Sequence, residues 1–247
     1  MNIQIITIYT LLIYKTLIII LCIYMIPFDL FPNIIRGLFI SFITIYFFDR
    51  IIKHTLSKAH WFALHSIINF IIVFFSLHDF KLCLQDINNS SLIIHNNTIL
   101  SSSLVLTLHV YHAMMYKMTK MDAFHHYLFV FCMSPLNILY CGKGLSMLCF
   151  FSCGLPGGID YFLLSLVKYD KIHYLTEKNI NSYLNTYIRM PGGFAASIII
   201  LKDGMKSVDL SFYSNILLSF LVFYNSAYFG KLAIENYVER KMLKDFN

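Results

Sequence analysis

Residues 61–77 read WFALHSIINFIIVFFSL, and no Asp, Glu, Lys or Arg interrupts them. A helix that crosses the hydrocarbon core of a membrane needs about 20 mostly apolar residues, and fewer where flanking side chains reach the interface. Lipid offers the backbone no hydrogen-bond partner, so a run of this kind has to be helical. We therefore predict a transmembrane helix here.

Similar apolar runs recur along the whole chain. They lie at about 3–26, 34–48, 99–116, 123–140, 145–167, 186–201 and 210–230, and together with 61–77 they give eight candidate spans. Run 34–48 is short and carries Arg36, and Pro191-Gly192-Gly193 interrupts run 186–201, so seven spans are the alternative. The predicted fold class is all-α, a multi-pass transmembrane helical bundle.

The composition excludes a soluble globular protein. Of the 247 residues, 58% are hydrophobic and only 13% are charged, whereas soluble domains are nearer half apolar and a quarter charged. The formal net charge is +6, but the basic residues form no dense patch. We therefore expect them to mark the cytoplasmic side and to contact lipid headgroups rather than to bind nucleic acid.

Lysine and arginine cluster in alternate connections, as the positive-inside rule requires. They concentrate in residues 50–58, 117–120, 168–178 and 240–244. We expect these segments and both termini on the cytoplasmic side, and the polar stretch 79–97 as a loop on the opposite side. Residues 3–26 lack a cationic start and a cleavage site, so they are expected as a retained first span. The six cysteines form no Cys-x-x-Cys pattern and are expected to be reduced and buried.

Polar groups at hydrocarbon depth are the informative ones, because burying them in lipid is costly. Five of the ten histidines fall there, namely His65, His109, His112, His125 and His126. Asp122 lies three and four residues before His125 and His126, so its carboxylate could orient either ring. An oriented imidazole is what general-base or nucleophilic catalysis needs, which makes these three the candidate catalytic residues. The alternative is a solvated pair at the membrane interface.

The histidines also raise the question of a metal. His109 and His112 share one helical face, three residues apart, and four histidines fall within 18 positions. The membrane di-iron enzymes, however, need several boxes of the type His-x-x-His-His, and the chain contains none. We therefore expect no metal ion.

A second polar stripe precedes Pro191. Asn181, Asn185 and Arg189 recur every fourth residue and so share one helical face. Such a wall could hold a headgroup, phosphate or carboxylate by charge-assisted hydrogen bonds, or it could belong to an interfacial helix whose arginine reaches water. The run 154–160, GLPGGID, is expected to break its span in mid-membrane, either to line a cavity with Asp160 or as a packing kink. The candidate substrate-binding residues are thus His65, His109, His112, Asp160, Asn181, Asn185 and Arg189.

Four short motifs follow one another in a characteristic order. They are SKAHWFALHSII at 57–68, DAFHH at 122–126, CGLP at 153–156, and the helix that carries Asn185 and Arg189. In this order they resemble the TLC-domain family of ceramide synthase-like multi-pass membrane proteins, over about residues 57–230. The family shows a Glu-x-Ser-x-Pro-like motif where this chain has CGLP, so its Glu is missing here. His112 stands where many members carry Asp after a Tyr.

The resemblance implies a six-helix membrane barrel around a lipid-sized cavity, into which His125 and His126 project. The expected organisation is two N-terminal helices with a loop (1–56), the TLC-like domain (57–230) and a short cytoplasmic tail (231–247). By the habit of the family, we expect the endoplasmic reticulum or another endomembrane.

Two functions follow from these features. The first is binding of a membrane lipid in the helical cavity, with a role in lipid homeostasis or sensing. The alternative is a lipid acyltransferase of the ceramide-synthase type, with acyl-CoA as co-substrate and a lipid amine or hydroxyl as acceptor. No other cofactor is expected. The expected partners are membrane lipids and a second copy of the chain, and no nucleic acid.

Overall fold

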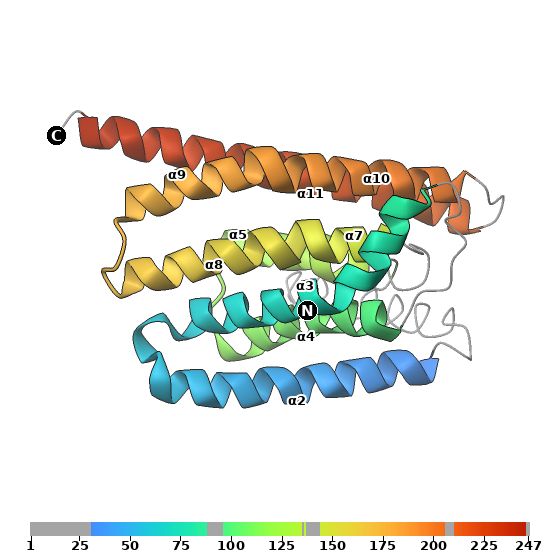
Figure 1. Cartoon of the computed structure of the whole chain (residues 1–247), viewed down its shortest axis with the longest axis horizontal. Helices are drawn as coiled ribbons and strands as arrows, with labels where there is room; N and C mark the ends of the chain where they lie inside the picture. Colours follow the sequence, from blue (N-terminus) through green and yellow to red (C-terminus); the bar gives the residue numbers. More distant parts are fainter. Residues whose placement is uncertain (1–30, 88–95, 135, 137–143, 206–209, 246–247) are drawn as a thin grey trace, which may run out of the picture.

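The computed structural model describes residues 31–87, 96–134, 136, 144–205 and 210–245. They form a bundle of long helices that run along a common axis (Figure 1). No strand occurs within these ranges, which confirms the all-α fold class. The predicted first span, 3–26, lies outside the described residues.

The first part of the bundle consists of three long helices and a shorter one. They are α2 (Phe31–Thr55), the 3-10 turn η1 (Ser57–Ala59) with α3 (His60–Gln85), α4 (Asn96–Met115), and α5 (Lys120–His125) continued by the π-helical η2 (His126–Phe131). In the second part, two long helices each contain a π-helical stretch. The first joins α7 (Gly144–Leu148), η3 (Cys149–Gly154) and α8 (Leu155–Lys168), and the second joins α9 (Tyr174–Leu184), η4 (Asn185–Arg189) and α10 (Met190–Gly204). Helix α11 (Leu210–Asp245) completes the bundle.

Five stretches of the described helix are long and apolar enough to cross a membrane, which fits an integral membrane protein. They are Phe31–Thr55, Ser57–Gln85, Asn96–Met115, Gly144–Lys168 and Phe212–Asp245. The predicted spans at 123–140 and 186–201 are helical where they are described, but they are not among these five.

The predicted loop at 79–97 is wrong at both of its ends. Helix α3 continues through Asp79 as far as Gln85, and α4 already begins at Asn96. The reason is a tertiary contact, since the hydroxyl of Thr98 in α4 donates to Asp79 Oδ2 at 2.5 Å. Both side chains are buried. Asp79, which ends the apolar run in the sequence, thus lies between α3 and α4 rather than in a loop.

The two predicted helix breaks are also absent. Neither 154–160 nor Pro191-Gly192-Gly193 interrupts its helix, and each proline instead follows a π-helical stretch that ends two residues earlier. Proline in a regular helix clashes with the preceding turn and removes one hydrogen bond. A wider π-helical turn ahead of it keeps the chain helical.

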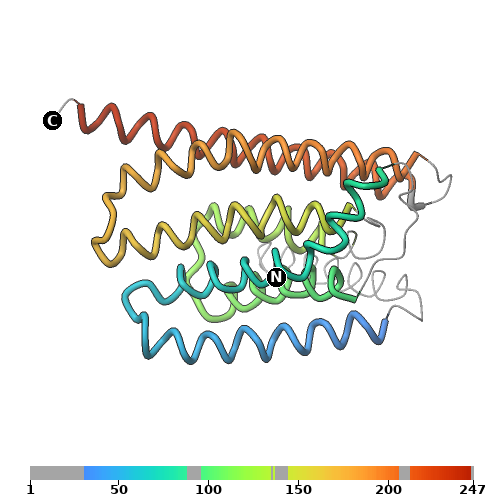
Figure 2. The backbone as a smooth tube through the Cα atoms, in the orientation of Figure 1, coloured from blue at the N-terminus to red at the C-terminus, as the bar shows by residue number. Residues whose placement is uncertain are grey.

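Helices α10 and α11 make the closest pair of the bundle (Figure 2). A Cβ atom on Gly193 would overlap Ser226 of α11, so glycine is what allows the two backbones to approach. One turn further on, the Ser197 hydroxyl donates to Ser219 O at 2.8 Å, and the Ser219 hydroxyl donates to Ser197 O at 2.9 Å. Small residues and reciprocal hydrogen bonds are the usual means by which helices associate in lipid.

The basic segments lie together at one end of the bundle. The α2–α3, α4–α5 and α8–α9 connections and the end of α11 all lie toward the left of Figure 1. These are the four segments rich in lysine and arginine, and residues 231–245 of the predicted tail continue α11. The structure thus groups the charges in the way that the positive-inside pattern requires.

A buried polar cluster ties α2 to its neighbours at this end. His60 Nε2 lies 2.8 Å from Asp49 Oδ1, and the Tyr116 hydroxyl donates to the same oxygen at 3.1 Å. Burial, together with the Asp49 carboxylate, raises the pKa of the Tyr116 phenol. The phenol therefore keeps its proton and acts as a donor, so the cluster holds the helices together.

Candidate functional site

A polar cavity of about 230 Å³ lies inside the bundle. Residues of α3, α4, α5, η3, α8, α9, η4 and α11 line it, so most of the described helices contribute to its walls, and the exposed Met121 marks an opening to the surface. Eight of the ten predicted site residues belong to the lining: His65, His109, Asp122, His125, Asp160, Asn181, Asn185 and Arg189. His112 and His126 do not belong to it.

Several buried polar atoms of this lining have no hydrogen-bond partner within the protein. They are His65 Nε2, His125 Nδ1, Ser152 Oγ, Asp160 Oδ1, Asn185 Oδ1 and Arg189 Nε. Most buried polar atoms in proteins are satisfied, because an unpaired one costs about 1–3 kcal/mol. Six of them around one cavity are therefore the property of the site that most needs a functional explanation.

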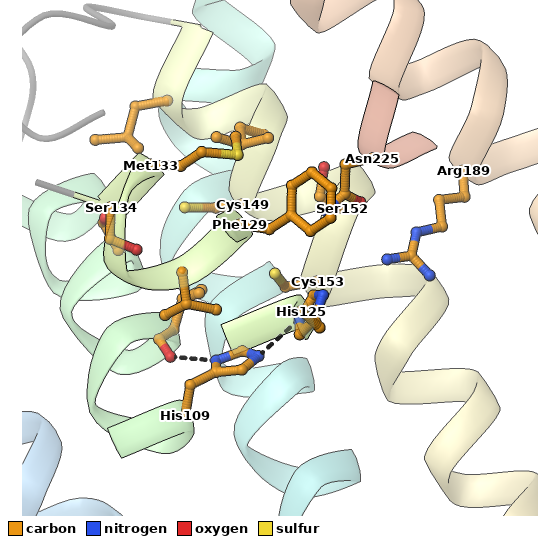
Figure 3. A pocket seen from close by; sticks show the side chains of 15 residues that line it. His109, His125, Phe129, Met133, Ser134, Cys149, Ser152, Cys153, Arg189 and Asn225 are labelled. Carbon is orange, nitrogen blue, oxygen red and sulfur yellow. Dashed lines mark hydrogen bonds between the residues drawn. The ribbon is translucent and has the colours of Figure 1, made fainter. Parts of the chain in front are cut away.

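His109 and His125 form the central pair of the site. His109 Nδ1 lies 2.7 Å from Val105 O, and His109 Nε2 lies 3.3 Å from His125 Nε2 (Figure 3). A carbonyl oxygen only accepts, so neutral His109 carries its proton on Nδ1 and accepts at Nε2. His125 then carries its proton on Nε2. Its Nδ1 is left as a free acceptor, and this is the atom without a partner.

The expected role of Asp122 differs in the structure. Its Oδ2 accepts from Thr119 N at 2.8 Å and from Thr119 Oγ1 at 2.7 Å, while Thr119 Oγ1 accepts from Asp122 N. These bonds form a capping box at the start of α5. Asp122 thus lines the cavity and fixes the helix end, and it is His109 that orients His125.

His126 and His112 lie together behind the cavity rather than in it. Their ring centroids are 5.0 Å apart, and the His126 ring is 5.1 Å from that of His109. Trp61 covers the group, with its ring 4.1 Å from His112 and 3.8 Å from His65. The adjacent histidines of 125–126 therefore have different surroundings, and the expectation that both project into the cavity is met only by His125.

The polar stripe forms one wall of the cavity. The Asn185 amide donates to Asn181 Oδ1 at 2.6 Å, which leaves Asn185 Oδ1 without a partner. The Arg189 guanidinium lies 5.5 Å from the centre of the Phe229 ring in α11. Figure 3 shows this arginine reaching into the bundle from the side opposite His109. Asn181, Asn185 and Arg189 therefore form an interior wall rather than part of an interfacial helix.

Each of the three π-helical stretches lies at the cavity. Stretch η2 directly follows His125, η3 contains Ser152 and Cys153, and η4 runs from Asn185 to Arg189. In a π-helical turn the hydrogen bonds span five residues, and such turns are frequent at functional sites. Here they set the rotation of the helices whose polar side chains line the cavity.

A second, smaller cavity of about 50 Å³ adjoins the first, and Figure 3 shows its lining. The two share five residues: His109, His125, Ser152, Cys153 and Arg189. The rest of the small cavity is mainly apolar, with Phe129, Met133 and Leu148 among its walls. The histidine pair and the arginine therefore stand where a polar space meets an apolar one.

Other lining residues carry weaker signals in the sequence. Asn69 lies one helical turn after His65, and Tyr161 follows Asp160, so both share elements with predicted residues. Asn69 is an amide inside the apolar run 61–77, and this signal could have identified it. Cys153 and Phe229 resemble any buried residue of a membrane helix and carry no such signal.

The described residues also bear on metal binding and on the cysteines. Within the described ranges, no three His, Cys, Asp or Glu side chains are arranged to hold a metal ion. Cys83 and Cys149 are buried and Cys153 is partly buried, whereas Cys132 is exposed, contrary to the expectation of burial. Cys22 and Cys141 lie outside the described residues.

Comparison with known proteins adds no information to this site. No family model, curated protein or solved structure matches the chain. The function is therefore argued from the geometry of the cavity.

Proposed function

We propose that the protein binds a membrane lipid by its headgroup in the polar cavity and serves in lipid homeostasis or sensing. The observation that carries the proposal is the set of six unpartnered polar atoms around one cavity. A bound headgroup would supply their hydrogen bonds and so recover the cost of burying them. The proposal includes a TLC-like architecture in an endomembrane, with both termini on the cytoplasmic side.

The size of the cavity supports a headgroup rather than a whole lipid. Sites that enclose a drug-sized ligand have about 300–1,000 Å³, and this cavity has about 230 Å³. The acyl chains would remain among the helices or in the surrounding lipid. Arg189 brings a cationic, multi-donor group into this space, which suits the anionic oxygens of a headgroup.

The test is native mass spectrometry of the protein purified in mild detergent. We expect wild type to retain lipid, and Arg189→Gln to retain at most about a tenth as much, which corresponds to about 1.4 kcal/mol. Arg50→Gln is the matched control, because Arg50 is exposed and stacks on Tyr46 away from the cavity. Equal retention by wild type and Arg189→Gln would contradict the proposal.

The second candidate function, acyl transfer, is favoured by a separate observation. The bonds from Val105 O through His109 to His125 leave His125 Nδ1 as a free base at the junction of the two cavities. In this role His125 would take the proton of a lipid amine or hydroxyl as it attacks the thioester of acyl-CoA, and the CoA thiolate would leave. His109 would take the orienting part that the sequence suggested for Asp122.

The adjacent histidines give this candidate a sharp test. We expect His125→Ala to abolish lipid acylation in membranes, and His126→Gln to retain it, because His126 lines neither cavity. Acylation that is unchanged in His125→Ala would eliminate the enzyme function and leave lipid binding as the function.

A further inference from the structure

The unpartnered atoms of the cavity divide unequally into donors and acceptors. Arg189 Nε can only donate. Asp160 Oδ1 and Asn185 Oδ1 can only accept, and the hydrogen bonds of His109 leave His125 Nδ1 as an acceptor too. The cavity therefore calls for a ligand with one strong acceptor group and several donors.

The charges of the cavity show the same division. Arg189 and the carboxylates of Asp122 and Asp160 are its charged groups. Asp122 Oδ2 is engaged by Thr119, and within the described residues no cation lies within ion-pair distance of Asp160. The carboxylate beside Asp160 on α9, that of Glu177, already has Lys178 Nζ at 2.9 Å. Asp160 and Glu177 lie within hydrogen-bond reach of each other, so the two carboxyl groups share one lysine, which leaves a place for one further cation beside Asp160.

We infer that the ligand is a lipid headgroup that carries both a primary ammonium and an anionic oxygen group. The anion, a phosphate or carboxylate, would face the Arg189 guanidinium, and the ammonium would face Asp160 and its neighbours. A primary ammonium has three N–H donors, which matches three unpartnered acceptors. A trimethylammonium has none and is bound in aromatic cages instead. This inference rests on the proposed function and narrows its ligand.

The inference separates lipid classes by the charges and N–H donors of their headgroups. Phosphatidylethanolamine has both charges and the N–H donors. Phosphatidylcholine lacks the donors, phosphatidylglycerol lacks the cation, and a sphingoid base lacks the anion. Free phosphoethanolamine has the charges without the tail and shows whether the cavity recognises the headgroup alone.

The experiment is competition between these lipids in nanodiscs, read by native mass spectrometry of the full chain. We expect phosphatidylethanolamine to be retained at least tenfold over phosphatidylcholine, phosphatidylglycerol and a sphingoid base. In Asp160→Asn the preference over phosphatidylglycerol should fall to within twofold. Asp203→Asn is the matched control, because Asp203 is a partly buried carboxylate of α10 that does not line the cavity.

The outcomes separate the two proposals. Equal retention of all the lipids overturns the ammonium inference and leaves headgroup binding in place, and so does a preference for the sphingoid base. Retention of none of them overturns the proposed function itself. If Asp160→Asn is not recovered folded, the shift in Tm of wild type on adding each lipid gives the same ranking, because a ligand stabilises the state that it binds.

Discussion

Two groups of polar side chains inside the bundle, the pair Ser197–Ser219 and the lining of the cavity, differ in how their hydrogen bonds are met. At the α10–α11 interface, Ser197 and Ser219 each donate to the other's backbone carbonyl, and both hydroxyls are thereby satisfied. At the cavity, Arg189 Nε, Asp160 Oδ1 and four further buried atoms have no partner in the protein. The serines complete a helix contact, whereas the cavity groups have hydrogen-bonding capacity that the protein itself does not use, and we propose that a lipid headgroup uses it.

The role of a polar residue in such a helix depends on whether it has a partner on the facing helix. A polar side chain that finds its partner on the facing helix contributes to association, and such bonds are worth about 0.6 kcal/mol on average. A charge that is buried without a partner lowers stability and is retained where function needs it. We therefore expect substitutions at the α10–α11 interface to lower stability, and substitutions at the cavity to lower lipid binding.

The largest effect is expected at the α10–α11 interface. Gly193→Leu would force a side chain into Ser226, where even a Cβ atom overlaps. Overpacking usually costs about 1–3 kcal/mol, and more where two backbones are pushed apart. We expect little monodisperse protein in size-exclusion chromatography and a strongly lowered Tm. Ile198→Leu, on the exposed side of the same helix, is the control and should behave as wild type.

A smaller effect is expected at the cavity, where the substitution should lower lipid retention but should not lower the Tm. Arg189→Met removes a buried charge whose Nε has no partner and keeps a side chain of similar length. We expect at least a tenfold loss of lipid retention together with an unchanged or higher Tm in lipid-free detergent, because a buried unpaired charge is destabilising. A clear fall in Tm would show that Arg189 stabilises the fold. The cavity would then not differ from the α10–α11 interface in its effect on stability.

The smallest effect is expected for the serine pair. Ser197→Ala and Ser219→Ala should each lower stability slightly, and the double mutant should lose less than their sum by about 0.6 kcal/mol. Lipid retention should not change in any of the three. The measurement is a double-mutant cycle from unfolding in mixed micelles. A coupling energy of zero would mean that the contact between the two hydroxyls, which lie 2.9 Å apart, does not contribute.

The helices could be predicted from the sequence because hydropathy is a local property. The stripe of Asn181, Asn185 and Arg189 could be predicted for the same reason, since one helical period places its members on one face. The helix ends could not, because they depend on tertiary partners. Asp79 interrupts an apolar run, and only its bond with Thr98 explains why α3 continues through it.

The chemistry of the histidines depends even more on contacts between helices. His109 and His125 belong to different helices, and nothing in their spacing says that Nε2 of one lies 3.3 Å from Nε2 of the other. Asp122 was the nearest carboxylate in the sequence, but Thr119 three residues earlier makes it a capping residue. A Thr three residues before an acidic residue at a helix start predicts a capping box rather than a carboxylate that orients an imidazole.

The π-helical stretches have a consequence for how such a cavity can be gained or lost. A π-helical turn holds one residue more than the α-helical turn that it replaces, so each stretch is equivalent to an insertion of a single residue. Deleting one residue of 186–188 would return η4 to regular α-helix and bring Arg189 from four residues to three residues after Asn185. A change of one codon would then alter the geometry of the wall, with every polar side chain of it still encoded.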